Sequence, residues 1–276
     1  MRTYYPVLSI AGSDSSGGAG IQADIKTISA LGCYAMTAIT SITAQNTTDV
    51  TAIQPVLPDI VKAQIEAVCK DIPPLAVKTG MLCDREVASA VADTLESLRP
   101  VNLVVDPVMV STSGSVLLED DAIETIRTRI FPLAMLVTPN IHEARVLTGE
   151  TDPAAQGERI LAMGPEAVLI KGGDSDNTDY KIDHLYIKGG GTMDFRADAV
   201  LTNNTHGTGC TLSSAIASFL ALGYDLVSAV GEGKLYVTRA LESGSFITTG
   251  SGHGPVNHFF SPRRLKNFNP RRVNRS

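Results

Sequence analysis

The chain has 276 residues, of which 43% are hydrophobic and 19% are charged. This composition excludes an intrinsically disordered protein, because disordered chains combine low hydrophobicity with high charge. Twenty-three Lys and Arg stand against 29 Asp and Glu, which argues against a nucleic-acid-binding protein, since duplex binding depends on a surplus of positive charge. The last sixteen residues, 261–276, differ from the rest of the chain because they contain six Arg and Lys and no acid.

The N-terminal residues and the cysteines lead to an expectation about location. Residues 1–18 contain no apolar segment of the length found in signal peptides, and no stretch approaches the roughly 18 uninterrupted apolar residues of a membrane helix. The four cysteines are isolated, with no pair at zinc-binding spacing. We therefore expect reduced thiols, a cytoplasmic location and no membrane contact.

Short apolar runs alternate with longer amphipathic segments along the chain. Strands are predicted at residues 7–11, 35–42, 50–56 (at a sheet edge), 75–78, 102–105, 134–138 and 167–171. Helices are predicted at residues 20–31, 58–70, 84–98, 120–130, 141–147, 154–163, 209–222 and 226–243. The segments 183–187 and 192–197 flank three consecutive glycines, which predicts an antiparallel hairpin.

Strands that run into polar or glycine turns and then into helices are typical of βαβ units and of a mostly parallel, buried sheet. We find no internal repeat and no linker. The sequence therefore predicts a single α/β domain over residues 1–260, followed by a basic tail over residues 261–276.

Polar residues collect directly after the predicted strands. The glycine-rich segment 12–20 follows the first strand, and later strands are followed by Lys78, Asp106, Asn140, Glu143 and Lys171. Because ligands in open α/β sheets bind beyond the carboxyl ends of the strands, these side chains should meet at one edge. Carboxylates, lysines and glycines together indicate phosphate and metal chemistry.

The glycine-rich segment has several interpretations. Residues 18–23 match the G-x-G-x-x-A dinucleotide fingerprint, but no acid that could bind the ribose follows at the end of the next strand. A nicotinamide cofactor is therefore disfavoured, and no P-loop sequence is present. The segment is either shaped by glycine for backbone reasons alone or forms a lid over a small polar substrate, with Asp14 or Asp24 as a contact.

The sharpest candidate site is the turn formed by Gly207, Thr208, Gly209 and Cys210, which opens a predicted helix. Successive backbone N–H groups and the helix dipole can bind an anion there and stabilise charge on a transferred phosphoryl group. A helix N-terminus typically lowers the pKa of a thiol, so Cys210 is expected to be positioned as a base. The alternative is a plain tight turn before a helix.

Eight motifs in chain order resemble the hydroxymethylpyrimidine/phosphomethylpyrimidine kinases of thiamine biosynthesis, in the ribokinase-like superfamily. They are residues 10–24, 43–47, 78–81, 106–109, 138–140, 171–173, 205–210 and 252–257. The resemblance implies a three-layer α/β sandwich, with helices on both faces of a mostly parallel sheet and a small antiparallel hairpin. It also implies a homodimer that uses ATP and Mg²⁺ to phosphorylate 4-amino-5-hydroxymethyl-2-methylpyrimidine and then its monophosphate.

The resemblance also implies roles for individual residues. The anion hole would be Gly207, Thr208 and Gly209 with Cys210 as base, and the pyrimidine would contact Gly12, Asp24, Gln45, Met81 and Val108. The ATP side would comprise Asp106, Asn140, Glu143, Lys171 and Lys234, with Asp106 and Glu143 organising Mg²⁺ through water. From the residues alone, Asp106 could instead cap a turn, Glu143 could be an acid favoured by a helix dipole, and Lys234 could be solvated.

One position departs from the family pattern. After residues 106–109 the family commonly has Val-Ala-Lys-Ser-Gly, whereas this chain has Thr112 in place of the lysine. If that lysine holds the incoming phosphate, the second phosphorylation is the step that the difference affects. Two other functions stay open: a pyridoxal kinase of vitamin B6 salvage, which would act on a similar flat heterocycle with a hydroxymethyl arm, and a binding or regulatory protein without turnover.

Overall fold

The computed structural model describes residues 2–110, 114, 117–173, 175 and 178–270. Thr112 and the end of the basic tail, from residue 271, lie outside this part of the chain.

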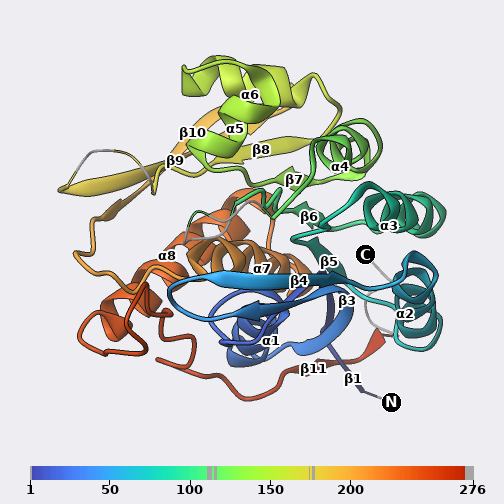
Figure 1. Ribbon diagram of the computed structural model, residues 1–276, viewed down its shortest axis with the longest axis horizontal. Coiled ribbons are helices and arrows are strands. Elements are labelled where there is room, and N and C mark those ends of the chain that lie inside the picture. Colours follow the sequence, from blue (N-terminus) through green and yellow to red (C-terminus); the bar gives the residue numbers. More distant parts are fainter. Residues whose placement is uncertain (1, 111–113, 115–116, 174, 176–177, 271–276) are drawn as a thin grey trace.

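A central sheet of nine strands in the described residues carries the fold (Figure 1), in the order β10-β9-β8-β7-β6-β5-β2-β3-β4. The strands are β2 (Pro6–Asp14), β3 (Tyr34–Gln45), β4 (Val50–Pro55), β5 (Ala76–Thr79), β6 (Leu103–Val105), β7 (Leu136–Val137), β8 (Ala167–Ile170), β9 (Tyr180–Ile187) and β10 (Gly191–Asp198). In this spatial order, neighbouring strands are parallel across β8-β7-β6-β5-β2-β3. The remaining strands, β4 at one edge and β9 and β10 at the other, pair antiparallel. The predicted mostly parallel sheet, edge strand and hairpin are confirmed.

Helices cover both faces of the sheet and complete the predicted three-layer sandwich. One layer contains α1 (Gly20–Ala30), α7 (Thr208–Ala221) and α8 (Leu226–Gly244). The other contains α2 (Pro58–Asp71), α3 (Arg85–Leu98), α4 (Asp120–Thr125), α5 (Ile141–Thr148) and α6 (Pro153–Leu161). Within the described residues, no helix has the length and apolarity that crossing a membrane requires.

The central strands are apolar because both of their faces are covered. Every residue of β5, β6, β7 and β8 is buried. Helix α7 is buried from Thr211 to Ala221, since it lies against the sheet between α1 and α8. Its start, Thr208 and Gly209 with Gly207 as the N-cap, is thereby held at the carboxyl edge of the sheet.

The described part of the basic tail is docked on the domain. Strand β11 (Asn267–Phe268) pairs antiparallel with β1 (Thr3–Tyr4) at the bottom of Figure 1. The backbone N–H of Arg263 donates to the carbonyl of Ala30 at 2.7 Å, and that of Lys266 donates to the carbonyl of Gly32 at 2.8 Å. The tail therefore packs on the turn between α1 and β3 and satisfies two of its backbone carbonyls.

We expect Gly32→Ala to lower the melting temperature more than Gly149→Ala. Both glycines have positive φ, 83° and 76°, so each substitution costs about 1 kcal/mol of backbone strain. A Cβ on Gly32 would also lie 2.6 Å from the carbonyl oxygen of Arg264, whereas one on Gly149 meets nothing within 4 Å. Gly32→Ala should therefore cost about 2–4 kcal/mol in total, or roughly 5–10 °C in Tm; equal Tm losses would contradict a stabilising tail.

Candidate active site

One cavity of about 860 Å³ lies where the carboxyl ends of the parallel strands meet the start of α7. Thirteen of the fourteen predicted site residues line it: Gly12, Gln45, Met81, Asp106, Val108, Asn140, Glu143, Lys171, Gly207, Thr208, Gly209, Cys210 and Lys234. The exception is Asp24. The parallel topology explains the gathering, because it brings the ends of strands that are far apart in sequence to one edge.

The start of α7 lies at the cavity, which Gly207, Thr208, Gly209 and Cys210 line; among them, Thr208 donates its N–H to the Thr205 carbonyl at 3.2 Å. Gly207 is the N-cap, with φ 79° and ψ 7°, and the helix begins at Thr208 without a side-chain cap. Unsatisfied N–H groups at a helix start form an anion site. The close approach of the glycine-rich loop requires glycine here, since a Cβ on Gly207 would lie 1.8 Å from the carbonyl oxygen of Gly18.

A side-chain hydrogen bond joins this turn to the glycine-rich loop. His206 Nε2 lies 2.8 Å from Asp14 Oδ2, and both side chains are buried. Burial alone would raise the pKa of Asp14, but hydrogen bonds from His206, Ser16 and the Ala19 N–H outweigh it and lower the pKa to about 2. His206 thus has a structural role in the turn, and the two loops are held against each other.

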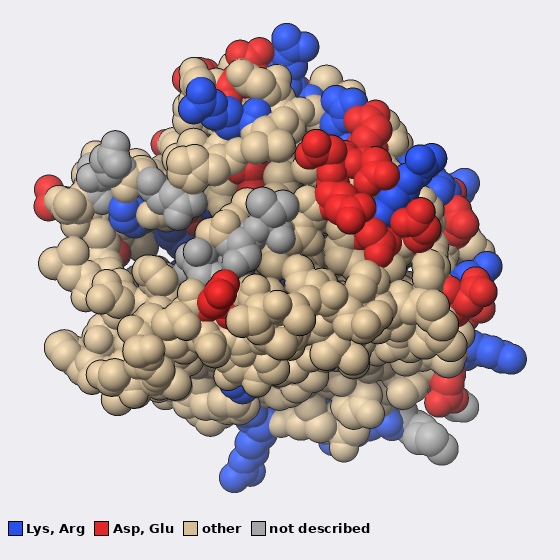
Figure 2. Space-filling model, viewed as in Figure 1, with Lys and Arg blue, Asp and Glu red and all other residues tan. Residues whose placement is uncertain are grey.

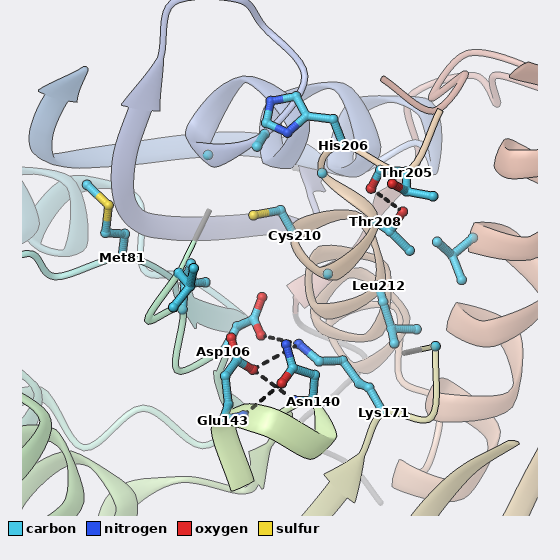
Figure 3. Close-up of a pocket in the computed structure, with 18 of the residues that line it drawn as sticks. Met81, Asp106, Asn140, Glu143, Lys171, Thr205, His206, Thr208, Cys210 and Leu212 are labelled. Carbon is cyan, nitrogen blue, oxygen red and sulfur yellow. Dashed lines mark hydrogen bonds and ion pairs between the residues drawn. The ribbon is translucent and has the colours of Figure 1, made fainter. Parts of the chain in front are cut away.

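Cys210 projects its sulfur into the cavity, on the side of α7 that faces Met81 (Figure 3). The expectation of a lowered thiol pKa is not met. Burial raises the pKa of Cys210 to about 11, with Asp24 and Asp106 adding to the rise, although the Lys78 ammonium and the Gly20 N–H act in the opposite direction. The resting thiol is therefore protonated at neutral pH.

A cluster of two carboxylates and one lysine lies across the cavity from the sulfur (Figure 3). Lys171 Nζ lies 2.8 Å from Asp106 Oδ1 and 3.7 Å from Glu143 Oε2. Thr138 and Ser213 donate their hydroxyls to Asp106 at 3.2 and 3.1 Å. Asp106 is thus part of a buried network, which is more than the cap of a turn.

The pKa values of the two carboxyl groups move apart. Burial raises the pKa of Glu143 to about 7 and the Asp106 charge adds to the rise, against the effect of Lys171. For Asp106, Lys171 and Lys78 outweigh burial and lower the pKa. Glu143 also closes a capping box at the start of α5, because its side chain accepts the Asn140 N–H at 2.8 Å while the Asn140 side chain accepts the Glu143 N–H. Glu143 is therefore both an acid at a helix N-terminus, as the alternative prediction had it, and a member of the cluster.

Two neighbouring buried carboxylates that repel one another fit a divalent cation. The described residues contain no group of three or more His, Cys, Asp or Glu that could hold a metal ion by themselves. Mg²⁺ usually keeps several waters and takes one or two carboxylates together with substrate phosphates. Asp106 and Glu143 fit that arrangement.

Lys234 is paired, although solvation was the alternative prediction. Its Nζ lies 2.9 Å from Asp183 Oδ2, and Asp183 Oδ1 accepts the Gly172 N–H at 2.9 Å. The pair joins α8 to β9 and fixes the backbone directly after Lys171. Asp183 was missed from the sequence; its signal was an acid two residues before Leu185, on the same buried face of the strand.

The predicted pyrimidine side has apolar walls and one amide. Met81 and Val108 line the cavity near Gly12, where a Cβ would lie 2.8 Å from Met81 Cε. Gln45 Oε1 accepts the Thr43 hydroxyl at 3.0 Å. Its Nε2 has no hydrogen-bond partner among the described residues, so the amide can donate to a ligand.

The structure corrects the prediction for Asp24, which does not line the cavity. Its side chain is fully buried in α1 and ion-paired with Lys78. Lys78 itself lines the cavity; the sequence predicted its place at this edge but did not include it among the site residues. Asp24 shares a helix face with Ile21 and Ile28, a pattern that signals a buried carboxylate in need of a cation.

Comparisons with known proteins agree on one family. The sequence model of the family described as phosphomethylpyrimidine kinase matches residues 14–257. The chain is 48% identical over 261 residues to the hydroxymethylpyrimidine/phosphomethylpyrimidine kinase of Rhizobium meliloti, which covers 91% of this chain and 96% of the relative.

Solved structures share the backbone. Phosphomethylpyrimidine kinase from Clostridium difficile is 47% identical and superposes with a TM-score of 0.75, covering 86% of this chain and 99% of its own. Pyridoxal kinase from Staphylococcus aureus, in complex with AMP-PCP and pyridoxal, is 32% identical with a TM-score of 0.85, covering 96% of this chain and 97% of its own. The fold is thus common to kinases named for two substrates, and sequence identity is higher to the one named for the pyrimidine.

Proposed function

The chain belongs to the phosphomethylpyrimidine kinase family, and on that basis we propose that it transfers the γ-phosphoryl group of ATP to the hydroxymethyl oxygen of 4-amino-5-hydroxymethyl-2-methylpyrimidine and then to the resulting monophosphate. The observation that carries the proposal is the cavity itself. A helix N-terminus with Cys210 lies at this cavity, and the cluster of Lys171, Asp106 and Glu143 lies beside it, since a Cβ on Gly209 would lie 3.3 Å from Lys171 Nζ. This arrangement suits phosphoryl transfer, in which catalysis consists mainly of positioning and charge stabilisation.

The pyrimidine would lie between the apolar walls formed by Met81 and Val108. The free Nε2 of Gln45 would donate to a ring nitrogen, and its oxygen, which accepts from Thr43 in this structure, has a second lone pair for the exocyclic amine. The ring would then place its hydroxymethyl arm toward Cys210.

The phosphates of ATP would lie at the start of α7, next to the cluster of Lys171, Asp106 and Glu143. The backbone N–H groups of Gly207, Thr208 and Gly209 would stabilise charge that develops on the transferred phosphoryl group. Lys171 would bind phosphate oxygens, and Asp106 and Glu143 would hold Mg²⁺ through water. When bound, Mg²⁺ would neutralise phosphate charge.

Cys210 would accept the hydroxyl proton of the pyrimidine. Only the thiolate can accept that proton, so the S–H proton of the resting thiol must first leave to solvent. Because little thiolate is present at neutral pH, we propose that proton removal is late and undemanding, as a loose phosphoryl transition state allows.

Gln45→Ala is expected to raise the KM for the pyrimidine about tenfold, with little change in the KM for ATP. One hydrogen bond to a neutral heterocycle contributes about 1 kcal/mol, and more where a buried partner is left unpaired. Steady-state kinetics with each substrate varied in turn measure the effect. If only the KM for ATP changed, the pyrimidine would be placed on the wrong side of the cavity.

Kinetics with both candidate alcohols and Mg-ATP test the proposed function. We expect a higher kcat/KM for the hydroxymethylpyrimidine than for pyridoxal, and the appearance of mono- and then diphosphate by phosphorus NMR. A strong preference for pyridoxal would identify the vitamin B6 alternative. ATP consumption that neither alcohol accelerates would support a binding protein without turnover.

We also propose a cytoplasmic homodimer, with no nucleic-acid or membrane partner. The face over β3 and β4 is nearly free of charged side chains (Figure 2), and Ile42, Ile53 and Leu57 are exposed there by 55%, 36% and 72%. Covering such a surface with a second copy removes apolar area from water. Sedimentation equilibrium should give twice the chain mass; a monomer at micromolar concentration would contradict this part of the proposal.

A further inference from the structure

A fully buried ammonium group lies at the cavity, in β5. Lys78 Nζ lies 3.0 and 2.9 Å from the two carboxylate oxygens of Asp24, and neither side chain has any exposed surface. Removing two charges from water is expensive, and a buried ion pair is often no more stabilising than apolar residues of the same volume. Stability alone is therefore a poor reason for this pair.

The carboxylate of Asp24 is saturated by protein donors. Ser9 Oγ donates to Oδ2 at 2.6 Å and Ser214 Oγ donates to Oδ1 at 2.6 Å. Each oxygen also accepts from Lys78, so each has two donors. These contacts leave Asp24 no capacity to bind a substrate, and they fix the position of the ammonium group. Ser214 lies one turn after Cys210 on the same face of α7, so the network lies directly behind the thiol.

Lys78 retains one donor. An ammonium group has three N–H donors, two of which go to Asp24, and no third partner is found among the described residues. Gly80 leaves room for the group, because a Cβ there would lie 2.9 Å from Lys78 Nζ. Both Lys78 and Cys210 line the cavity.

The charged groups that act on the Cys210 thiol come from several elements. Lys78 in β5 favours the thiolate, as does the Gly20 N–H, whereas Asp24 in α1 and Asp106 after β6 oppose it. Lys171, after β8, also interacts electrostatically with Cys210. Lys78 is the largest influence that favours the thiolate.

We propose that Lys78, fixed by Asp24, is a positioning residue for Cys210 whose ammonium group stabilises the thiolate, the form that accepts the proton of the acceptor hydroxyl. In that step the substrate O–H bond breaks and an S–H bond forms. The oxygen bonds to the γ-phosphorus as the bond to ADP breaks, and ADP leaves with the electron pair. The inference deepens the proposed function and rests on it for the identity of the acceptor.

The two members of the pair should have opposite effects on the thiol. Asp24→Asn removes the negative charge of the pair and keeps the positive charge of Lys78, with Asp106 as its remaining carboxylate neighbour. Lys78→Met removes the positive charge and leaves Asp24. A residue with a merely structural role would not produce changes of opposite sign.

The test is the rate at which iodoacetamide alkylates Cys210 between pH 6 and 10. Peptide mass spectrometry follows Cys210 separately from the other three cysteines. We expect Asp24→Asn to react about tenfold faster than the wild type at pH 7.5 and Lys78→Met about tenfold slower, because a change of one pKa unit alters the thiolate fraction tenfold. Ser214→Ala, which removes a hydrogen bond without a charge, should change the rate less than about twofold.

The charge-neutral double variant, Asp24→Asn with Lys78→Met, keeps the proposal testable where Lys78→Met alone does not fold. Its rate should be well below that of Asp24→Asn, because only the latter keeps the ammonium group. Equal rates for these two variants, or shifts of the same sign in both single variants, would overturn the inference. Alkylation requires no substrate, so a chain that shows these shifts but does not phosphorylate the pyrimidine contradicts the proposed function alone.

Discussion

Gly207→Ala is expected to lower kcat by about 100- to 1000-fold. The residue has a φ of 79°, and a Cβ there would lie 1.8 Å from the carbonyl oxygen of Gly18. The turn must therefore move away from the glycine-rich loop, and the N–H groups that we propose face the phosphoryl group move with it. Loss of one preorganised donor to a developing oxyanion typically has an effect of about this size. Steady-state kinetics with saturating Mg-ATP and pyrimidine measure it.

Gly189→Ala is the matched control. Gly189 also has positive φ, 68°, but a Cβ there meets nothing within 4 Å, and the residue lies in the turn between β9 and β10. The control carries similar backbone strain and should keep kcat within about twofold, since it leaves the start of α7 in place. If Gly207→Ala also kept near wild-type turnover while folded, the anion-hole assignment would be wrong.

Cys210→Ala should lower kcat about 100-fold while the KM values for both substrates change less than about threefold. A positioned proton acceptor contributes roughly this factor or more, and removing one sulfur takes away little contact with the ground state. Cys69→Ala is the matched control, because Cys69 is partly buried in α2 and does not line the cavity. Near wild-type turnover of Cys210→Ala would remove the proton-acceptor role.

The pH dependence of these proteins follows from the protonated thiol. The pKa of Cys210 is raised to about 11, so the thiolate fraction of the free enzyme increases as pH rises from 7 to 10. If proton transfer limits turnover, kcat/KM of the wild type should rise over this range, and Cys210→Ala should lose the rise. A wild-type profile that falls over the same range would contradict the role of the thiolate.

The architecture and most of the site could be predicted because both depend on local patterns. Buried runs such as Ala167–Ile170 and the glycines at 189–191 identify parallel strands and a hairpin without any knowledge of distant contacts. Once the sheet is known to be parallel, the residues that follow its strands must meet at one edge. Lys171 and Asp106 are 65 positions apart, yet their side chains form an ion pair of 2.8 Å.

What the sequence did not reveal depends on burial and on partners distant in the chain. The helix dipole suggested an acidic Cys210, but its burial and the carboxylates of Asp24 and Asp106 raise the thiol pKa instead. Asp24 lies in a motif next to the cavity, but its place on the buried face of α1 keeps it out of the cavity lining. The pairing of Lys234 with Asp183 joins two segments whose proximity no local pattern indicates.

The tail was a further limit. Its basic composition gave no indication of a contact with the domain, yet the backbone of residues 263–268 forms hydrogen bonds with the turn after α1 and with β1. Backbone pairing is nearly independent of side-chain charge, so composition could not reveal it. The acidic side chains gather elsewhere, over α3 and α4 (Figure 2).

The most direct test of the account is a crystal structure of the chain with the hydroxymethylpyrimidine and a non-hydrolysable ATP analogue. We expect the hydroxymethyl oxygen within hydrogen-bonding distance of Cys210 Sγ, the ring next to Gln45 and Met81, and the γ-phosphate facing the N–H groups of Gly207–Gly209. A pyrimidine bound with its hydroxyl away from Cys210, or a γ-phosphate away from the start of α7, would contradict the assignment of this turn as the reaction centre.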